Sequence, residues 1–502
     1  MLNIPERKTR IYFPFLCILL VGLGLRIFYF PYNLPLTSDS IDYFRYATEI
    51  VILGHLPTTW TPINNGWPIF LSFWFSIINL ENSFDYMQVQ RAISIILSSL
   101  ITIPVYFLCK RFFDNKLALV GAALFAFDPR IILNSTLGIT EPLFILLGVT
   151  SLVIFLKYDR KSIIISFMLA AMCTTVRSEG VFLFLTLTIL FFVKYRISKN
   201  IVKTYLPSMV IFFLILVPIM DYRIDITGTD GIFLRASGEA SSILSDANQS
   251  GTNRISEGIG LFLKYLGWIM IPNFLIFLPL GVIQFLRKRN KDTNFIIILT
   301  IISSIPILYA YIVQAQDTRY FYFLFPIFCL ISLFSVKSFL SKIKRKNLLI
   351  VILIVGIFVA SISFYEYKKI NFDDEKEMYE IAKITKSIVN GVNYHPTETA
   401  YIRSSEIPEK WPFIFHDEMY KIKIIQTNDF NNLENFILKS KNKLTHIIID
   451  KNEKLPEFLK TVFSNEEKYE YLEKVFDSKD EGFKHHVKIF KINFQKFNNI
   501  EN

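Results

Sequence analysis

Apolar runs close to the length of a membrane-spanning helix recur through the first 365 residues of this 502-residue chain. A helix needs about 20 apolar residues to cross a bilayer core about 30 Å thick. With 52% hydrophobic residues and a mean hydropathy of +0.39, the composition is too apolar for a soluble protein of this size. The pattern predicts a polytopic α-helical membrane protein with about eleven transmembrane helices. The candidate spans lie near 11–30, 92–109, 117–134, 140–156, 162–177, 180–193, 204–220, 259–286, 293–313, 321–338 and 347–365, and a shorter run at 67–80 is expected to be re-entrant or interfacial.

The Lys and Arg residues, which give a net charge of +11, lie in short patches between the apolar runs. Alternate loops carry these patches, beginning with Lys110, Arg111 and Lys116. Because cytoplasmic loops are enriched in basic residues, this asymmetry predicts a multi-pass protein of the cell membrane with its N-terminus in the cytoplasm. It also argues against a nucleic-acid partner. The opposite loops contain no lysine and are expected outside: 31–91, 128–139, 177–180, 221–258 and 314–320.

The composition changes after residue 365, and two domains are expected, a transmembrane module at 1–365 and a second domain at 366–502. The second part is rich in Lys, Glu, Asp and Asn, and it alternates helix-like with β-rich stretches. That alternation predicts a small α/β domain, which an odd number of spans places on the extracytoplasmic side. The helix-like stretches are 375–390, 431–442 and 455–475, and the β-rich ones are 421–426, 445–450 and 486–492.

The segment TSDSIDYFRY in the first outer loop carries an acidic pair, Asp39 and Asp42. Residues three apart share one face of a helix, so both carboxylates are expected to point the same way. Tyr43, Arg45 and Tyr46 add groups that can hydrogen-bond a polar ligand. A second interpretation is structural, in which Asp39 caps the helix and Asp42 closes a capping box.

Further ionisable residues lie at the outer ends of the predicted spans, where charges are costly unless they are paired or hydrated. If the helices gather them, they form a cleft with acidic and arginine-bearing walls. Arginine suits phosphate oxygens, and a carboxylate suits general-base work on a hydroxyl. A local interpretation also holds for each residue, such as a pair across the tight turn between Arg177 and Glu179. The residues are Asp128, Arg130, Glu141, Arg177, Glu179, Asp317 and Arg319.

Several motifs in order resemble the polyprenyl-phosphate-dependent glycosyltransferases of the GT-C fold, in particular the protein O-mannosyltransferase and lipid A aminoarabinose transferase group. LRIFYFPYNLPLTSDSIDYFRYA is similar to the end of that family's first span and its first outer loop. NGWPIFLSF, FAFDPRIILNSTLGITEPLF, TVRSEG and DTRYFYFLFP resemble later segments. The first acidic site reads Asp-Ser-Ile-Asp where relatives often have adjacent Asp-Glu, which leaves Asp39 and Asp42 as alternatives. A Trp-Trp-Asp-Tyr-Gly block is missing, which argues against an oligosaccharyltransferase catalytic subunit.

The resemblance implies a polyprenyl- or dolichyl-phosphate sugar donor bound beside membrane lipid, and an extracytoplasmic protein, lipid or glycan acceptor. It makes Asp39 the general base of an inverting transfer. It assigns the donor phosphate to Arg177 and Arg319, with Arg130 as a third candidate. Asp42, Asp128 and Glu141 are expected to support the site or position donor and acceptor. The dependence on a divalent metal varies in that family, and no other cofactor is implied.

Two other classes of function fit part of the pattern. Charged residues near helix ends also line transport pathways, so a membrane transporter or lipid flippase is the alternative. Transporters place their sites near the bilayer midplane and often show repeated halves, whereas here the charges gather on one face and the halves do not repeat. A receptor that uses residues 366–502 to bind a partner is a third hypothesis.

Overall fold

The computed structural model describes residues 6–501 except 38, 81, 197–200, 234–251, 288–290, 370–371, 391–400, 404–422, 425–431, 440–443 and 452–455. Its contacts divide the chain into two compact units. The first comprises Met1–Phe30 and Asp42–Ile370, and the second comprises Pro31–Ile41 and Asn371–Asn502. A piece of the first predicted outer loop therefore belongs to the C-terminal unit.

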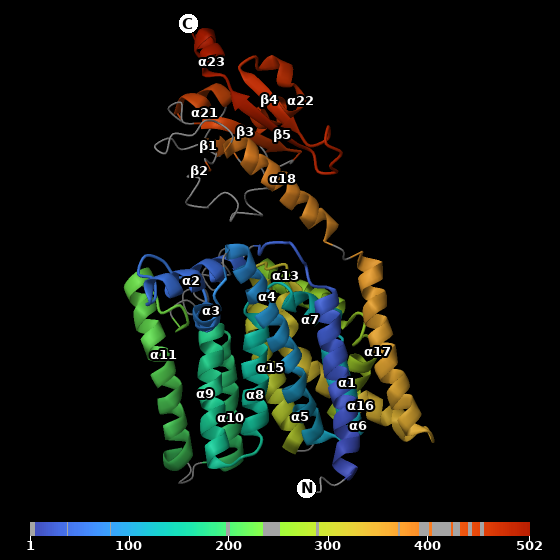
Figure 1. Ribbon diagram of the computed structural model, residues 1–502. Helices are drawn as coiled ribbons and strands as arrows, with labels where there is room; N and C mark the ends of the chain where they lie inside the picture. The colour runs from blue at the N-terminus through green and yellow to red at the C-terminus, as the bar shows by residue number, and fades with distance from the viewer. Residues whose placement is uncertain are drawn as a thin grey trace. The chain divides into compact units, whose positions relative to one another are not determined.

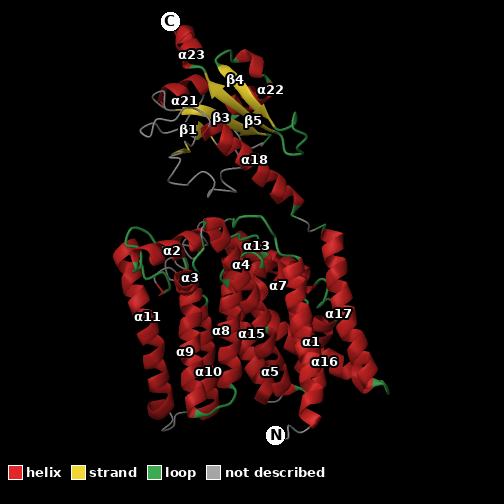
Figure 2. Ribbon diagram, in the orientation of Figure 1, coloured by secondary structure: helices red, strands yellow, loops and turns green. Residues whose placement is uncertain are grey.

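The first unit is a bundle of helices, many of them running roughly parallel (Figures 1 and 2). Helix α2 (Asp39–Leu53) begins in the second unit and continues into the first. The other helices of the first unit are α1 (Glu6–Phe28), α3 (Gly66–Ile77), α4 (Ser83–Leu100), α5 (Thr102–Phe112), α6 (Asn115–Ala126), α7 (Pro129–Ser135), α8 (Glu141–Phe155), α9 (Arg160–Val176), α10 (Gly180–Tyr195), η1 (Ile201–Tyr205), α11 (Leu206–Thr227), α13 (Thr252–Met270), α14 (Phe277–Arg287), α15 (Lys291–Ile312), η2 (Thr318–Leu324), α16 (Phe325–Ser341) and α17 (Lys346–Lys368).

Within the described residues, five helices are long and apolar enough to cross a membrane, and a bent pair adds a sixth. Five further apolar helices are 10–17 residues long. The predicted α-helical class and the multi-pass membrane character are confirmed, but the count of about eleven spans is not. The five long spans are Ser83–Phe112, Ile201–Thr227, Asn294–Ile312, Thr318–Ser341 and Lys346–Lys368.

Two predicted single spans are broken, one by a sharp bend and one by a gap of several residues. The run at 117–134 breaks between α6 and α7, which meet at 53°. Asp128 caps α7 by accepting hydrogen bonds from the backbone amides of Arg130 and Ile131, and Pro129 follows at the first helical position. Proline is favoured at a helix start but lacks the N–H that would continue α6. The run at 259–286 is likewise divided, because α13 ends at Met270 and α14 begins at Phe277.

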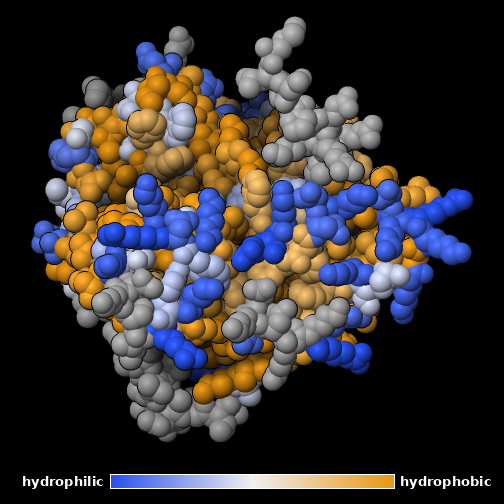
Figure 3. Space-filling model, turned by 90° about the horizontal axis from the view of Figure 1, so that it is seen from below, coloured by the Kyte–Doolittle hydropathy of each residue, from blue (hydrophilic) through white to orange (hydrophobic). Residues whose placement is uncertain are grey.

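Buried polar contacts hold the bundle together. Arg26 of α1 is fully buried, and its guanidinium donates to the carbonyls of Gly22 and Ala126 and to the hydroxyl of Ser98. Buried polar groups cost free energy unless they are hydrogen-bonded, so this arginine joins α1, α4 and α6 at a defined depth. At the end of the unit where the N-terminus lies, hydrophilic side chains form a band across a hydrophobic surface (Figure 3).

Two glycines permit close contacts that position the site. A Cβ on Gly66, at the start of α3, would lie 2.7 Å from the backbone of Thr175 and Val176 in α9. A Cβ on Gly180, at the start of α10, would lie 2.6 Å from the backbone nitrogen of Thr174. Both glycines allow helix starts to press against the last turn of α9, just before Arg177.

The second unit contains a five-stranded sheet of order β2-β1-β3-β5-β4 (Figure 2). Strands β1, β2 and β3 are parallel, and β5 is antiparallel to both β3 and β4. Helix α18 contributes Met378 and Ile381 to a core with Ile448 of β3, and Leu34 from the first loop packs there too. The elements are α18 (Asp373–Asn390), β1 (Tyr401–Arg403), β2 (Lys423–Ile424), α21 (Leu433–Lys439), β3 (Leu444–Asp450), α22 (Glu457–Ser464), η4 (Glu466–Lys468), β4 (Leu472–Asp477), β5 (Val487–Ile492) and α23 (Phe494–Glu501).

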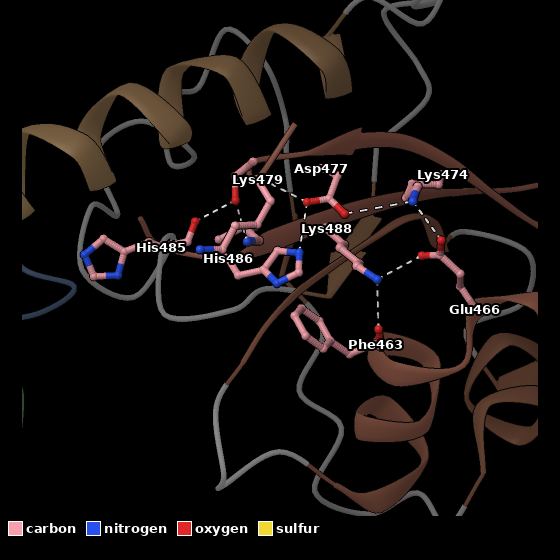
Figure 4. Close-up of polar contacts among 10 residues, drawn as sticks. Phe463, Glu466, Lys474, Asp477, Lys479, His485, His486 and Lys488 are labelled. Atoms are coloured by element: carbon pink, nitrogen blue, oxygen red, sulfur yellow. Dashed lines mark hydrogen bonds and ion pairs between the residues drawn. The ribbon is translucent and has the colours of Figure 1, made fainter. Parts of the chain in front are cut away.

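The predicted C-terminal α/β domain is confirmed, but the helix-like stretch at 455–475 extends too far. Its last residues belong to β4, an edge strand whose Glu and Lys are good helix formers. Pairing with β5 overrides that propensity. An ionic network covers this edge: Glu466 accepts from Lys474 at 2.7 Å and from Lys488 at 3.1 Å, and His486 contacts Asp477 at 2.9 Å (Figure 4).

Candidate functional site

A cavity that is partly open to solvent lies within the first unit, between α8, α10, α15 and η2, and its empty space, including the open part, is about 510 Å³. Helix α8 packs against η2, and α10 packs against α15, so four segments far apart in the sequence enclose it. One part of the wall is charged or polar and the remainder is apolar or aromatic. The lining residues are Glu141, Phe144, Ile145, Arg177, Glu179, Phe182, Leu183, Ser303, Pro306, Ile307, Arg319, Tyr320 and Phe323.

Arg177 is the centre of the charged wall. It ends α9, and its side chain is 14% exposed. One terminal nitrogen lies 2.6 Å from a carboxylate oxygen of Glu141, and the other lies 2.7 Å from Glu179. The first nitrogen also donates to the Thr140 hydroxyl at 3.3 Å. Glu141 begins α8 and Glu179 directly precedes α10, so the ion pairs connect three helix ends.

These carboxylates keep Arg177 charged. Burial by itself lowers the pKa of Arg177, but the charges of Glu179 and Glu141 outweigh that effect and hold the pKa above its ordinary value. Tyr43 of α2, next in sequence to Asp42, adds to the same shift. The guanidinium thus carries a permanent positive charge in a largely desolvated position.

Arg319 supplies the second guanidinium, from η2. Its Nε lies 3.1 Å from a carboxylate oxygen of Asp317, and the side chains of Arg319 and Asp317 are 30% and 46% exposed. Asp317 also caps η2 by accepting from the Arg319 backbone amide at 2.9 Å. An ion pair this exposed is worth about 0–1 kcal/mol, so an anion can compete for the guanidinium.

Three predicted site residues therefore line one cavity: Glu141, Arg177 and Arg319. Asp39 begins α2 and is half-buried, whereas Asp42 is exposed and belongs to the first unit. Their proposed roles as general base and supporting acid remain predictions.

Asp128 and Arg130 are not among the residues that line this cavity. Asp128 is fully buried and caps α7. Arg130 donates to the backbone carbonyls of Trp268 and Ile271, and its guanidinium lies 4.8 Å from the Phe364 ring centre. Arg130 thus ties α7 to α13 and α17, whereas Asp128 holds the first turn of α7, and a direct role of either residue in binding remains a prediction.

Nothing in the described part of the chain resembles a metal site with three or more His, Cys, Asp or Glu ligands. The two carboxylates that line the cavity, those of Glu141 and Glu179, are both ion-paired to Arg177. This donor set does not fit a divalent cation, because both carboxylates are already bound to a guanidinium.

Sequence reasoning assigned no role to the wall formed by α15, which contributes Ser303, Pro306 and Ile307. These residues lie within the predicted span at 293–313, which contains no charged residue, so no charge or motif marks them. The proline inside the helix was the one available signal.

The overall architecture is that of the GT-C membrane glycosyltransferases. The chain is similar to ArnT from Cupriavidus metallidurans, with a TM-score of 0.59 in the apo state at 11% identity, covering 95% of this chain and 97% of that one. The ArnT structure bound to undecaprenyl phosphate gives a TM-score of 0.57 at 10% identity, covering 97% and 98%. The GT-C resemblance seen in the sequence motifs is thus confirmed.

Two further comparisons bear on the chain. The Archaeoglobus fulgidus oligosaccharyltransferase in the apo form is similar with a TM-score of 0.57 at 14% identity, covering 89% of this chain and 70% of that one. Residues 68–222 match the family model of the dolichyl-phosphate-mannose-protein mannosyltransferases. That segment carries Glu141, Arg177 and Glu179, whereas Arg319 lies beyond it. Curated proteins yield no match to this sequence.

Proposed function

We propose that this chain is a membrane glycosyltransferase that moves a sugar from a polyprenyl-phosphate donor to an extracytoplasmic acceptor. The observation that supports it best is the cavity in which Arg177 and Arg319 stand beside an apolar wall, within a GT-C fold. A lipid phosphate is complementary to this cavity, because its phosphate can bind the guanidinium groups and its isoprenoid chain can pack against the Phe and Leu side chains. A structure of the fold neighbour ArnT holds undecaprenyl phosphate, which supports the same ligand class here.

In this proposal the guanidinium of Arg319 binds the donor phosphate, because its exposed partner Asp317 can be displaced. Arg177 adds positive potential from a position fixed by Glu141 and Glu179. Both charges stabilise the leaving phosphate as the bond to the sugar breaks.

Asp39 acts as the general base in the same proposal. It takes the proton of the acceptor hydroxyl as the acceptor oxygen forms a bond to the anomeric carbon. The bond from that carbon to the phosphate oxygen breaks, and the polyprenyl phosphate leaves with the electron pair. A single displacement of this kind inverts the anomeric configuration.

Transfer from a radiolabelled polyprenyl-phosphate sugar, measured in membranes containing the full-length protein, tests the proposal. Asp39→Asn should reduce transfer at least 100-fold, a typical loss for a general base. Asp85→Asn is the matched control, because Asp85 is an exposed carboxylate in the same predicted outer loop. Undiminished transfer by Asp39→Asn at normal expression would exclude Asp39 as the base. Lipid scrambling by the wild-type protein without any glycosyl product would favour the flippase alternative.

A further inference from the structure

Ser303 of α15 is a buried polar residue in an apolar part of the cavity wall. The residue is 4% exposed, and it lines the cavity together with Pro306 and Ile307. Residues three and four apart share one face of a helix, so these three residues present a single surface to the cavity.

The hydroxyl of Ser303 has no hydrogen-bond partner among the residues that the structure describes. Its neighbours in α15 behave differently. Thr300 donates to the Ile296 carbonyl and Ser304 donates to the Thr300 carbonyl, each at 2.7 Å. Buried helical hydroxyls ordinarily bond in this way to the carbonyl four residues earlier. Ser303 therefore keeps a buried donor at the cavity wall, where most buried polar groups are paired.

Pro306 removes a backbone hydrogen bond from the same stretch of α15. It has no backbone N–H, so the carbonyl of Ile302 loses its bond from residue 306. Pro306 itself lines the cavity. The stretch of α15 that includes this part of the wall therefore has a buried hydroxyl on Ser303 and a backbone carbonyl on Ile302 without its usual helical donor.

The charged side of the cavity is balanced before any ligand enters, because two arginines and two glutamates line it. Two nitrogens of Arg177 are bound to carboxylates, and the Nε of Arg319 is bound to Asp317. A phosphate group offers several acceptor oxygens. A neutral hydroxyl from another wall adds a donor without adding a charge that would need its own partner.

We propose that Ser303 is a ligand-binding residue whose hydroxyl donates a hydrogen bond to a phosphate oxygen of the lipid-phosphate donor. The proposal rests on the function proposed above, and it assigns α15 a direct part in headgroup recognition. A residue kept for binding rather than for folding has a recognisable signature. Removing its hydroxyl should weaken binding while the ligand-free protein keeps or gains stability.

Farnesyl phosphate and farnesol are suitable probes for calorimetric titration into the purified full-length protein in lipid nanodiscs. Ser303→Ala should bind farnesyl phosphate about ten- to hundredfold more weakly, the range for one hydrogen bond to a charged group, and should bind farnesol as the wild type does. Ser304→Ala is the matched control, since Ser304 bonds only its own helix in the described contacts. The unfolding temperature of ligand-free Ser303→Ala should be equal to or above that of the wild type. Competition by inorganic phosphate measures how much of the binding belongs to the headgroup alone.

The outcomes separate the two proposals. If the wild type prefers farnesyl phosphate and Ser303→Ala keeps that preference in full, the assignment of Ser303 is wrong while the proposed function stands. Equal weakening of farnesol by Ser303→Ala, or a lower unfolding temperature without ligand, also overturns the assignment. If the wild type does not distinguish farnesyl phosphate from farnesol, the proposed lipid-phosphate site fails and the Ser303 assignment fails with it.

Discussion

Breaking the ion pairs of Arg177 one partner at a time tests the architecture of the cavity. Arg177→Gln leaves Glu141, whose side chain is 4% exposed, as an unpaired buried carboxylate. Such a loss costs about 3–5 kcal/mol. Glu141→Gln leaves Arg177 bound to Glu179 at 2.7 Å and removes one charge-assisted hydrogen bond, which costs about 1.5–3 kcal/mol. Glu179 is 29% exposed, so Glu179→Gln should cost only about 0–1 kcal/mol.

The double variant Arg177→Gln/Glu141→Gln makes the test sharper. It removes the unpaired carboxylate together with its cause, so it should recover part of the stability lost by Arg177→Gln, with a coupling energy of about 2 kcal/mol. Unfolding by sodium dodecyl sulfate in mixed micelles measures the four free energies on full-length protein. Two results would refute the reasoning: a larger loss from Glu179→Gln than from Glu141→Gln, or full additivity in the double variant.

Three other predictions concern separate parts of the chain. Asp39→Asn should abolish sugar transfer while farnesyl phosphate binding stays unchanged, and loss of both would contradict a role confined to proton transfer. Gly66→Ala should cost about 1–3 kcal/mol of stability, because its Cβ would lie 2.7 Å from backbone atoms of α9, whereas Gly24→Ala, with nothing within 4 Å, should be neutral or stabilising. His446 of β3 is buried, and burial and then Lys491 lower its pKa from 6.5 to about 4. Between pH 6.5 and pH 4 the imidazole of His446 is protonated in the unfolded chain but neutral in the folded chain. The second unit should therefore lose stability as the pH falls below 6.5, by about 2 kcal/mol at pH 5. Pulse proteolysis should show this loss, and His446→Gln should remove most of it.

Much of the fold follows from patterns that a sequence displays directly. Long apolar runs and the composition change after residue 365 predict the helical bundle and the small C-terminal unit, because burial in lipid and burial in a soluble core demand different side chains. Helix ends were harder to predict. The break between α6 and α7 depends on Pro129 within a run that hydropathy averages into one span. Strand β4 depends on pairing with β5, a contact between segments that no local propensity reports.

The site divides in the same way. Charged residues at helix ends, such as Arg177 and Arg319, can be recognised in the sequence because a charge near a membrane is costly unless it is paired or hydrated. Their specific partners do not stand out, since Glu141 reaches Arg177 across 36 positions of sequence. The hydroxyl of Ser303, unpaired among the described residues, could not be predicted from the sequence, for a different reason. A serine in an apolar helix ordinarily bonds its own backbone, and only the three-dimensional structure shows that Thr300 and Ser304 do so while Ser303 does not.

The two arginines of the cavity cannot have equivalent roles, although the sequence presents them alike. Arg177 is 14% exposed and bound by two carboxylates at 2.6 Å and 2.7 Å, so an incoming phosphate would have to displace a buried partner to bind it in the same way. Displacing Glu141 would leave that carboxylate buried and unpaired, at a cost that one phosphate contact does not offset. Arg319 is 30% exposed, and its partner Asp317 can return to water. Within the proposed function, this difference supports Arg319 as the direct phosphate ligand and Arg177 as a fixed charge. Arg319→Lys should accordingly weaken farnesyl phosphate binding more than Glu179→Gln does, because lysine lacks the planar fork that binds phosphate at two points.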